Sequence, residues 1–75
     1  MPKLPRISDT EAIRALERLG FEQIRQKGSH IILKKETERG TTGCVVPLHD
    51  ELAIGTLHGI LKQAAVTADE LIEKL

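Results

Sequence analysis

The order of its hydrophobic patterns constrains the fold of this chain more than any other feature. One helical pattern comes first, three β-patterned runs follow, and two further helical patterns close the chain. Ser8 and Glu11 open the first helix as a capping box, in which each side chain accepts a hydrogen bond from the other residue's backbone N–H. Gly20 favours the end of this helix, because glycine readily takes the left-handed conformation there. The apolar residues between these signals recur at helical spacing: Ala12, Ile13, Leu16 and Leu19.

The middle of the chain has the features of a β-sheet. Phe21–Lys27 and Ser29–Lys35 are two strands predicted to form a hairpin around Gly28. Glu36–Thr42 is predicted to be a polar loop, and Gly43–His49 the third strand. Short connections of this kind join antiparallel neighbours, so we expect one three-stranded antiparallel sheet.

Two helical patterns follow the last strand. Thr56 is the predicted cap of the first, which carries a single apolar stripe: Leu57, Ile60, Leu61 and Ala64. Thr67 and Glu70 form a second capping box, which opens a last helix with Leu71, Ile72 and Leu75. The predicted fold class is therefore α+β in the order α-β-β-β-α-α, with the helices on one face of the sheet, since an apolar sheet face must be covered by another layer.

The chain is long enough for one domain, predicted to span residues 1–75. A chain of this size buries only about 60% of its unfolded surface, and Phe21 is its one aromatic residue, so the core must be aliphatic. Cys44 is the single cysteine and is expected to be a small buried hydrophobe in a reducing compartment. No stretch has the length of a membrane span, and the first six residues lack the apolar segment of a signal peptide. We therefore expect a cytoplasmic protein that does not contact a membrane.

Alternation along the strands predicts which side chains face the helices and which face solvent. Five are expected under the helices: Ile31, Leu33, Cys44, Val46 and Leu48. A two-residue turn at Gly28 and Ser29 pairs Lys27 with His30, and it leaves Ile24 opposite Leu33 in the core. Pairing Leu33 with Val46 in the second hairpin brings His49 opposite His30. The open face then gathers Arg25, Lys27, His30, Lys34 and His49.

The charges are unevenly distributed, although the net charge is zero. Residues 1–39 contain nine Lys and Arg against six Asp and Glu, which gives +3. Residues 40–75 contain two against five, which gives −3. A neutral protein of this kind is still able to present a cationic face to an anionic partner such as RNA, with modest and salt-sensitive attraction.

His30 is the candidate for acid–base chemistry, because imidazole is the side chain whose unperturbed pKa lies closest to neutral. A proton carrier within a cationic patch suits cleavage of an RNA phosphodiester, in which Lys27 or Arg25 would stabilise the anionic transition state. His49 is the candidate for the second proton transfer. Each histidine taken alone is more often a solvated strand or turn residue than a catalytic one.

Other chemistries find little support in the sequence. Three histidines and one cysteine at scattered positions fit no zinc pattern, and no carboxylate cluster suggests magnesium. We therefore expect no metal and no cofactor. Aromatic stacking on single-stranded RNA is not available to this chain, so binding would depend on backbone contacts and shape.

Four short motifs, in order and at compatible spacing over nearly the whole chain, resemble those of the HicA toxins. They are Gly20-Phe21, Arg25-Gln26-Lys27-Gly28-Ser29-His30, Val46-Pro47-Leu48-His49, and Gly55-Thr56-Leu57 leading to Ile60-Leu61. The resemblance implies a small mRNA interferase with a double-stranded-RNA-binding-domain-like fold. It also implies a type II toxin–antitoxin pair in which a HicB antitoxin is the inhibitor. The family's catalytic histidine falls on His30, with Gly28 and Ser29 as its turn, whereas the resemblance gives His49 no role.

The sequence thus favours a metal-independent endoribonuclease toxin with His30 as general base or acid. Arg25, Lys27, Gly28, Ser29, Lys34 and His49 would support it or bind RNA. Two alternatives remain open: a non-catalytic RNA-binding module that uses the same face, and a protein-interaction domain that docks a partner on a sheet edge or helix.

Overall fold

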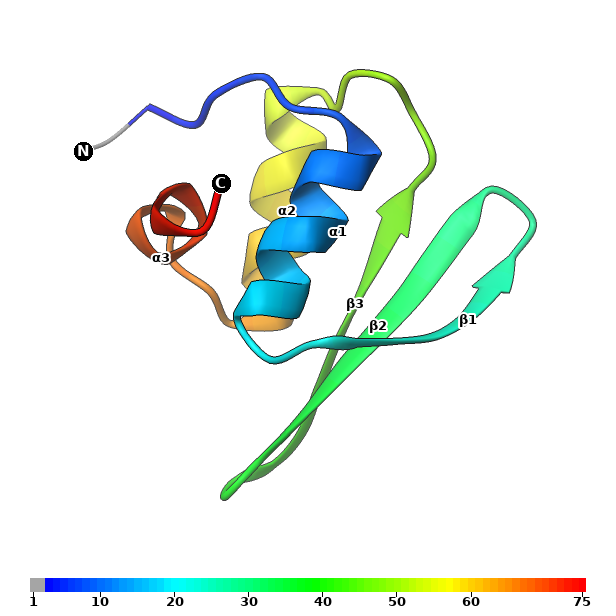
Figure 1. Ribbon diagram of the computed structural model, residues 1–75, viewed down its shortest axis with the longest axis vertical. Coiled ribbons are helices and arrows are strands. Elements are labelled where there is room, and N and C mark those ends of the chain that lie inside the picture. Colours follow the sequence, from blue (N-terminus) through cyan, green and yellow to red (C-terminus); the bar gives the residue numbers. More distant parts are fainter. Residues whose placement is uncertain (1–2) are drawn as a thin grey trace.

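The computed structural model describes residues 3–75; Met1 and Pro2, the first residues of the predicted domain, lie outside the described part. Its elements are α1 (Asp9–Arg18), β1 (Glu22–Lys27), β2 (His30–Thr37), β3 (Gly40–Pro47), α2 (Ile54–Ala64) and α3 (Ala68–Glu73). The strands form an antiparallel sheet in the order β1-β2-β3. Figure 1 shows the helices gathered on one side of this sheet, where α2 packs on β3 and α3 packs on α1. The predicted α+β class and element order are confirmed.

Both predicted capping boxes are present. The Glu11 N–H donates to Ser8 Oγ and the Ser8 N–H donates to Glu11 Oε1, each over 3.1 Å. In α3, the Glu70 N–H donates to Thr67 Oγ1 over 3.1 Å, and the Thr67 N–H donates to Glu70 Oε1 over 3.0 Å. Gly20 follows α1 with a φ of +103°, as its predicted role in ending that helix requires.

The predicted start of the second helix is wrong. Thr56 lies inside α2, which begins at Ile54 after Ala53, and no side chain caps it. Leu52 is 1% exposed, and its N–H donates to the Ile7 carbonyl over 2.8 Å. Burial of this neighbouring leucine therefore sets where the chain enters the helix, in place of a local cap.

The predicted polar loop at 36–42 is also wrong. β2 continues to Thr37 and β3 begins at Gly40, so that only Glu38 and Arg39 form the turn. Thr37 Oγ1 accepts from the Arg39 N–H over 3.2 Å and donates to the Gly40 carbonyl over 2.8 Å. This end of the hairpin projects beyond the helices (Figure 1), so polar residues occupy it without loss of core packing.

The register of the second hairpin differs from the prediction by two residues. Leu33 pairs with Cys44 and Ile31 pairs with Val46, because the two-residue turn after Thr37 fixes the pairing. A shift of two keeps every side chain on its predicted face. Leu33 and Val46 are therefore both 0% exposed, as expected, although they are not partners.

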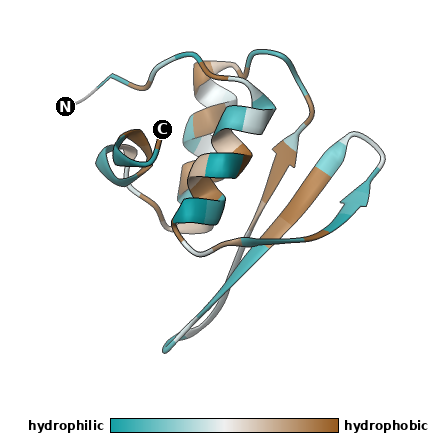
Figure 2. Ribbon diagram, viewed as in Figure 1, coloured by the Kyte–Doolittle hydropathy of each residue, from teal (hydrophilic) through white to brown (hydrophobic). Residues whose placement is uncertain are grey.

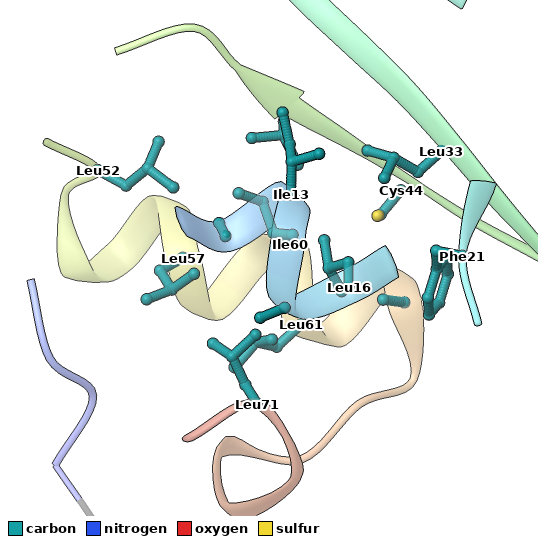
Figure 3. Close-up of a cluster of buried hydrophobic side chains, with 14 of the residues drawn as sticks. Ile13, Leu16, Phe21, Leu33, Cys44, Leu52, Leu57, Ile60, Leu61 and Leu71 are labelled. Atoms are coloured by element: carbon teal, nitrogen blue, oxygen red, sulfur yellow. The ribbon is translucent and has the colours of Figure 1, made fainter. Parts of the chain in front are cut away.

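A β-bulge overturns the prediction that Ile24 lies in the core. Gln23 pairs with Leu33 and Arg25 pairs with Ile32, so Ile24 has no partner on β2 and is 50% exposed. Bulges insert an extra residue and redirect the side chains near it. Phe21, which is 3% exposed, packs into the core just before β1 (Figure 3).

The core is a single cluster of aliphatic side chains apart from Phe21 and Cys44, as the composition predicted. It lies between the sheet and the helices (Figure 3), where the strands also show their most hydrophobic stretches (Figure 2). Ile31, Leu33, Cys44 and Val46 are buried there, and Leu48 is partly buried against them. Burial raises the pKa of the Cys44 thiol to about 11, so this cysteine is a packed hydrophobe as predicted.

Candidate functional site

His30 lies at the end of a tight turn that the backbone holds on two sides. Gly28 has a φ of +58° and Ser29 has no positive φ, the pattern of a type II′ turn, which favours glycine at its first central position. Gln26 Nε2 donates to the Gly28 carbonyl over 2.9 Å. The Leu48 N–H donates to the Ser29 carbonyl over 2.7 Å and ties the turn to the segment after β3. The start of β2, and with it His30, is thus fixed relative to both neighbouring strands.

The face of the sheet away from the helices, here called the open face, is a grid of cross-strand rows. From the turn that holds His30 towards the other end, the rows are Lys27–His30–Pro47, Arg25–Ile32–Val45, Glu22–Lys34–Gly43 and Glu36–Thr41. Successive rows are about 6.6 Å apart, since they are two residues apart and each strand residue rises about 3.3 Å. Each of the first three rows holds one Lys or Arg, and carboxylates appear only in the third and fourth rows, at Glu22 and Glu36.

The structure brings four of the predicted site residues together on this face: Arg25, Lys27, His30 and Lys34. All four are exposed, as are Gly28 and Ser29 of the turn. Lys27 lies directly opposite His30, as predicted. Within residues 3–75, no side-chain hydrogen bond or ion pair occupies the His30 imidazole, so the ring is accessible to a ligand on the open face.

The prediction that His49 lies opposite His30 is wrong. Pro47 pairs with His30, because the register is shifted by two residues, and β3 ends there. The His49 carbonyl accepts from the Asp9 N–H over 3.0 Å, which fixes this residue at the beginning of α1. His49 is exposed, but it is not a cross-strand neighbour of the candidate catalytic residue.

Gln26 is a part of the site that the sequence reasoning did not identify. It appears in the motif before the turn, yet neither its residue type nor its spacing indicates that its amide reaches the Gly28 carbonyl. That contact depends on the side-chain conformation at the edge of the sheet, and no sequence signal reports it.

Across residues 3–75, no three His, Cys, Asp or Glu side chains come together so as to hold a metal ion. None of the helices in the described part of the chain is both long enough and apolar enough to cross a membrane.

The fold and this face define a class of small α+β protein, with a helix-covered three-stranded sheet and an accessible histidine at a tight hairpin turn. The family model of the HicA toxin of bacterial toxin-antitoxin systems matches residues 10–66, well over half of the chain. The chain belongs to the HicA toxin family. It therefore has the role of the toxin in such a system, and an antitoxin is its implied partner. No curated protein matches the chain closely enough to be counted as a relative.

Proposed function

We propose that this toxin is a metal-independent endoribonuclease that cleaves mRNA in the cytoplasm, with His30 as general base or general acid. The observation that carries the proposal is the position of the His30 imidazole. It is exposed beside a tight turn, with Lys27 directly opposite and Arg25 in the adjacent row. A HicB-like antitoxin is the partner that would inhibit it.

The chemistry requires two proton transfers. The RNA 2′-oxygen bonds to the adjacent phosphorus and the bond from phosphorus to the 5′-oxygen breaks, which leaves a cyclic phosphate and a 5′-hydroxyl. His30 takes the proton from the 2′-hydroxyl or gives one to the leaving 5′-oxygen, a role that contributes roughly 10²–10⁴-fold. Lys27 and Arg25 stabilise the negative charge on phosphorus in the transition state.

The supporting residues act through position. Gly28 allows the tight turn that directs His30 to the open face, and Ser29 continues it. Lys34, four residues along the same strand, supplies a further cationic contact for the RNA backbone about 13 Å from His30. His49 is not opposite His30, so the second proton transfer falls to Lys27 or to water.

His30→Ala tests this proposal, because it removes the proton transfer and very little packing. Cleavage of a defined RNA by the purified variant should fall roughly 10²–10⁴-fold, while the melting temperature and antitoxin binding stay at wild-type values. His58→Ala is the matched control, since His58 is also an exposed histidine but lies on α2, outside the open face. Wild-type cleavage should persist in EDTA. Equal cleavage rates for wild type and His30→Ala would remove His30 from the mechanism.

One observation favours a second candidate function, a non-catalytic RNA-binding module. The site has no second histidine opposite His30, so the pair of imidazoles expected for two proton transfers is not assembled. Wild-type protein that binds RNA on the open face but leaves it intact at every pH from the imidazole to the lysine range would establish this alternative.

A further inference from the structure

The peptide group that joins Gly28 to Ser29 is the central one of the tight turn before His30. The two turn types common in two-residue hairpins, I′ and II′, differ chiefly in the direction in which this group faces. Type I′ needs a positive φ at both central residues, whereas type II′ needs it only at the first. Gly28 has a φ of +58° and Ser29 has no positive φ. The turn is therefore type II′, and its central peptide faces one way only.

A side-chain hydrogen bond shows which way this peptide faces. Gln26 Nε2 donates to the Gly28 carbonyl over 2.9 Å. Gln26 pairs with Ile31, whose side chain is buried under the helices. Because strand side chains on the same row share a face, the Gln26 side chain leaves β1 on the side opposite to the open face. The Gly28 carbonyl therefore points away from the open face.

The N–H of the same peptide group points the other way. No peptide bond in residues 3–75 is cis, and the N–H and C=O of a trans peptide are directed oppositely. The Ser29 N–H is therefore directed to the open face, where Lys27 and His30 flank the turn. In the described part of the chain, this N–H donates to no other group, and Ser29 is exposed. The turn itself lies apart from the helices (Figure 1), so a ligand on the open face is able to reach this donor.

A free backbone donor beside His30 matches a group in the proposed reaction. The two non-bridging oxygens on phosphorus gain negative charge in the transition state, although no bond to them forms or breaks. A fixed N–H that donates to such an oxygen stabilises it, and removing one donor of this kind lowers kcat about 10²–10³-fold in other enzymes. Ser29 directly precedes His30 in the chain, so the same phosphate is within reach of the N–H and the imidazole.

We propose that the Ser29 backbone N–H donates a hydrogen bond to a non-bridging oxygen of the cleaved phosphate. Gln26 is the positioning residue, because its bond to the Gly28 carbonyl holds the central peptide with this N–H towards the open face. The inference rests on the proposed function, to which it adds one contact with the reacting phosphate. The contact comes from the backbone, so neither the serine hydroxyl nor any charged side chain supplies it.

Ser29→Pro is the central test, because proline has no N–H and its fixed negative φ suits the second central position of a type II′ turn. Ser29→Ala is the matched reference, since both variants lack the hydroxyl and only alanine keeps the N–H. The probe is a defined RNA in EDTA under single-turnover conditions. We expect Ser29→Pro to cleave it about 10²–10³-fold more slowly than Ser29→Ala does.

A second readout isolates the hydrogen bond from any structural effect. Two further RNAs carry sulfur in place of one or the other non-bridging oxygen at the cleaved phosphate. Sulfur is a weak hydrogen-bond acceptor, so wild type and Ser29→Ala should cleave one of these two isomers more slowly than the other. The difference between the isomers should shrink in Ser29→Pro.

Gln26→Glu tests the positioning role, with Gln23→Glu as its matched control. Both substitutions add one negative charge at an exposed position of β1, but only Gln26 contacts the turn. A carboxylate cannot donate to the Gly28 carbonyl, so Gln26→Glu should lower kcat about fivefold to tenfold and raise KM no more than Gln23→Glu does. Gln26→Lys regains a donor and should recover kcat.

The opposite results would overturn the inference. Equal cleavage rates for Ser29→Pro and Ser29→Ala would show that the N–H does not contact the phosphate. If Ser29→Pro melts well below Ser29→Ala, a chemically ligated chain with an ester in place of the Gly28–Ser29 amide removes the N–H and keeps the serine. An unchanged difference between the sulfur isomers in that chain would contradict the proposal, and equal kcat for Gln26→Glu and Gln23→Glu would remove Gln26 from it. Failure of the proposed function shows separately, as unimpaired cleavage by His30→Ala.

Discussion

At the scale of single residues, the position of His30 depends on its immediate neighbours in the chain. Gly28 takes the positive φ that the turn needs, and a Cβ at this position would meet no other atom within 4 Å. The constraint at Gly28 is therefore conformational and not steric. Lys27 and His30 flank the turn and so must face each other, which is why the sequence was sufficient to pair them.

Lys27→Glu should weaken RNA binding, since it replaces an attraction beside His30 with a repulsion. The side chain is exposed, so the free energy of unfolding should change by no more than about 0.5 kcal/mol. An electrophoretic binding assay and a melting curve measure the two effects. Lys62→Glu makes the same charge change on α2, outside the open face, and should bind RNA as wild type does. Unchanged binding by Lys27→Glu would mean that RNA does not contact the open face.

At the scale of elements, helix starts show the contrast between local and tertiary control. α1 and α3 begin at side-chain caps that are encoded within four residues, whereas α2 begins without one. The chain before α2 is held by Leu52, which is buried and bonded to Ile7 through its backbone. A cap is thus necessary only where packing does not already fix the start.

The capping box of α3 should make the helix sensitive to acid. Hydrogen bonds from the backbone and side chain of Thr67 hold the pKa of the Glu70 carboxyl below its ordinary value of 4.5. Because the folded pKa is the lower one, this stabilisation is complete above the unfolded pKa and is lost as the pH falls through the folded value. Thermal melts of wild type and Glu70→Gln should therefore differ at neutral pH and converge well below pH 4.5. A constant difference across this range would contradict the assignment.

Thr67→Ala removes the other half of the same box. It should lower the free energy of unfolding at neutral pH by about 1 kcal/mol, the usual cost of losing a threonine cap. Chemical denaturation measures this loss. Thr56→Ala is the matched control, because Thr56 lies within α2 and caps nothing, so its effect should be clearly smaller.

At the scale of the whole molecule, stability depends on one small aliphatic core. A chain of this size is expected to have about 4–11 kcal/mol of stability in total. Leu33 is 0% exposed at the centre of the sheet, so Leu33→Ala should cost about 2–5 kcal/mol. Ile24→Ala removes a comparable side chain that is 50% exposed and should cost much less. Denaturation midpoints compare the two, and similar losses would show that the assignment of strand faces is wrong.

The sequence by itself determined the two capping boxes, the Gly28 turn, the faces of β2 and β3 and the grouping of Arg25, Lys27, His30 and Lys34. Family membership was also apparent from motifs in order. The capping boxes and the turn each involve only a few consecutive residues, so the sequence specifies them without any tertiary contact.

Only the tertiary structure decided the register of β3, the bulge at Ile24, the start of α2 and the position of His49. The physical reason is the two-residue period of a strand: a slip of two keeps every apolar side chain inside, so hydrophobicity alone does not distinguish the registers. The turn at Glu38 and Arg39 makes the choice, and it moves His49 away from His30 while leaving the core unchanged.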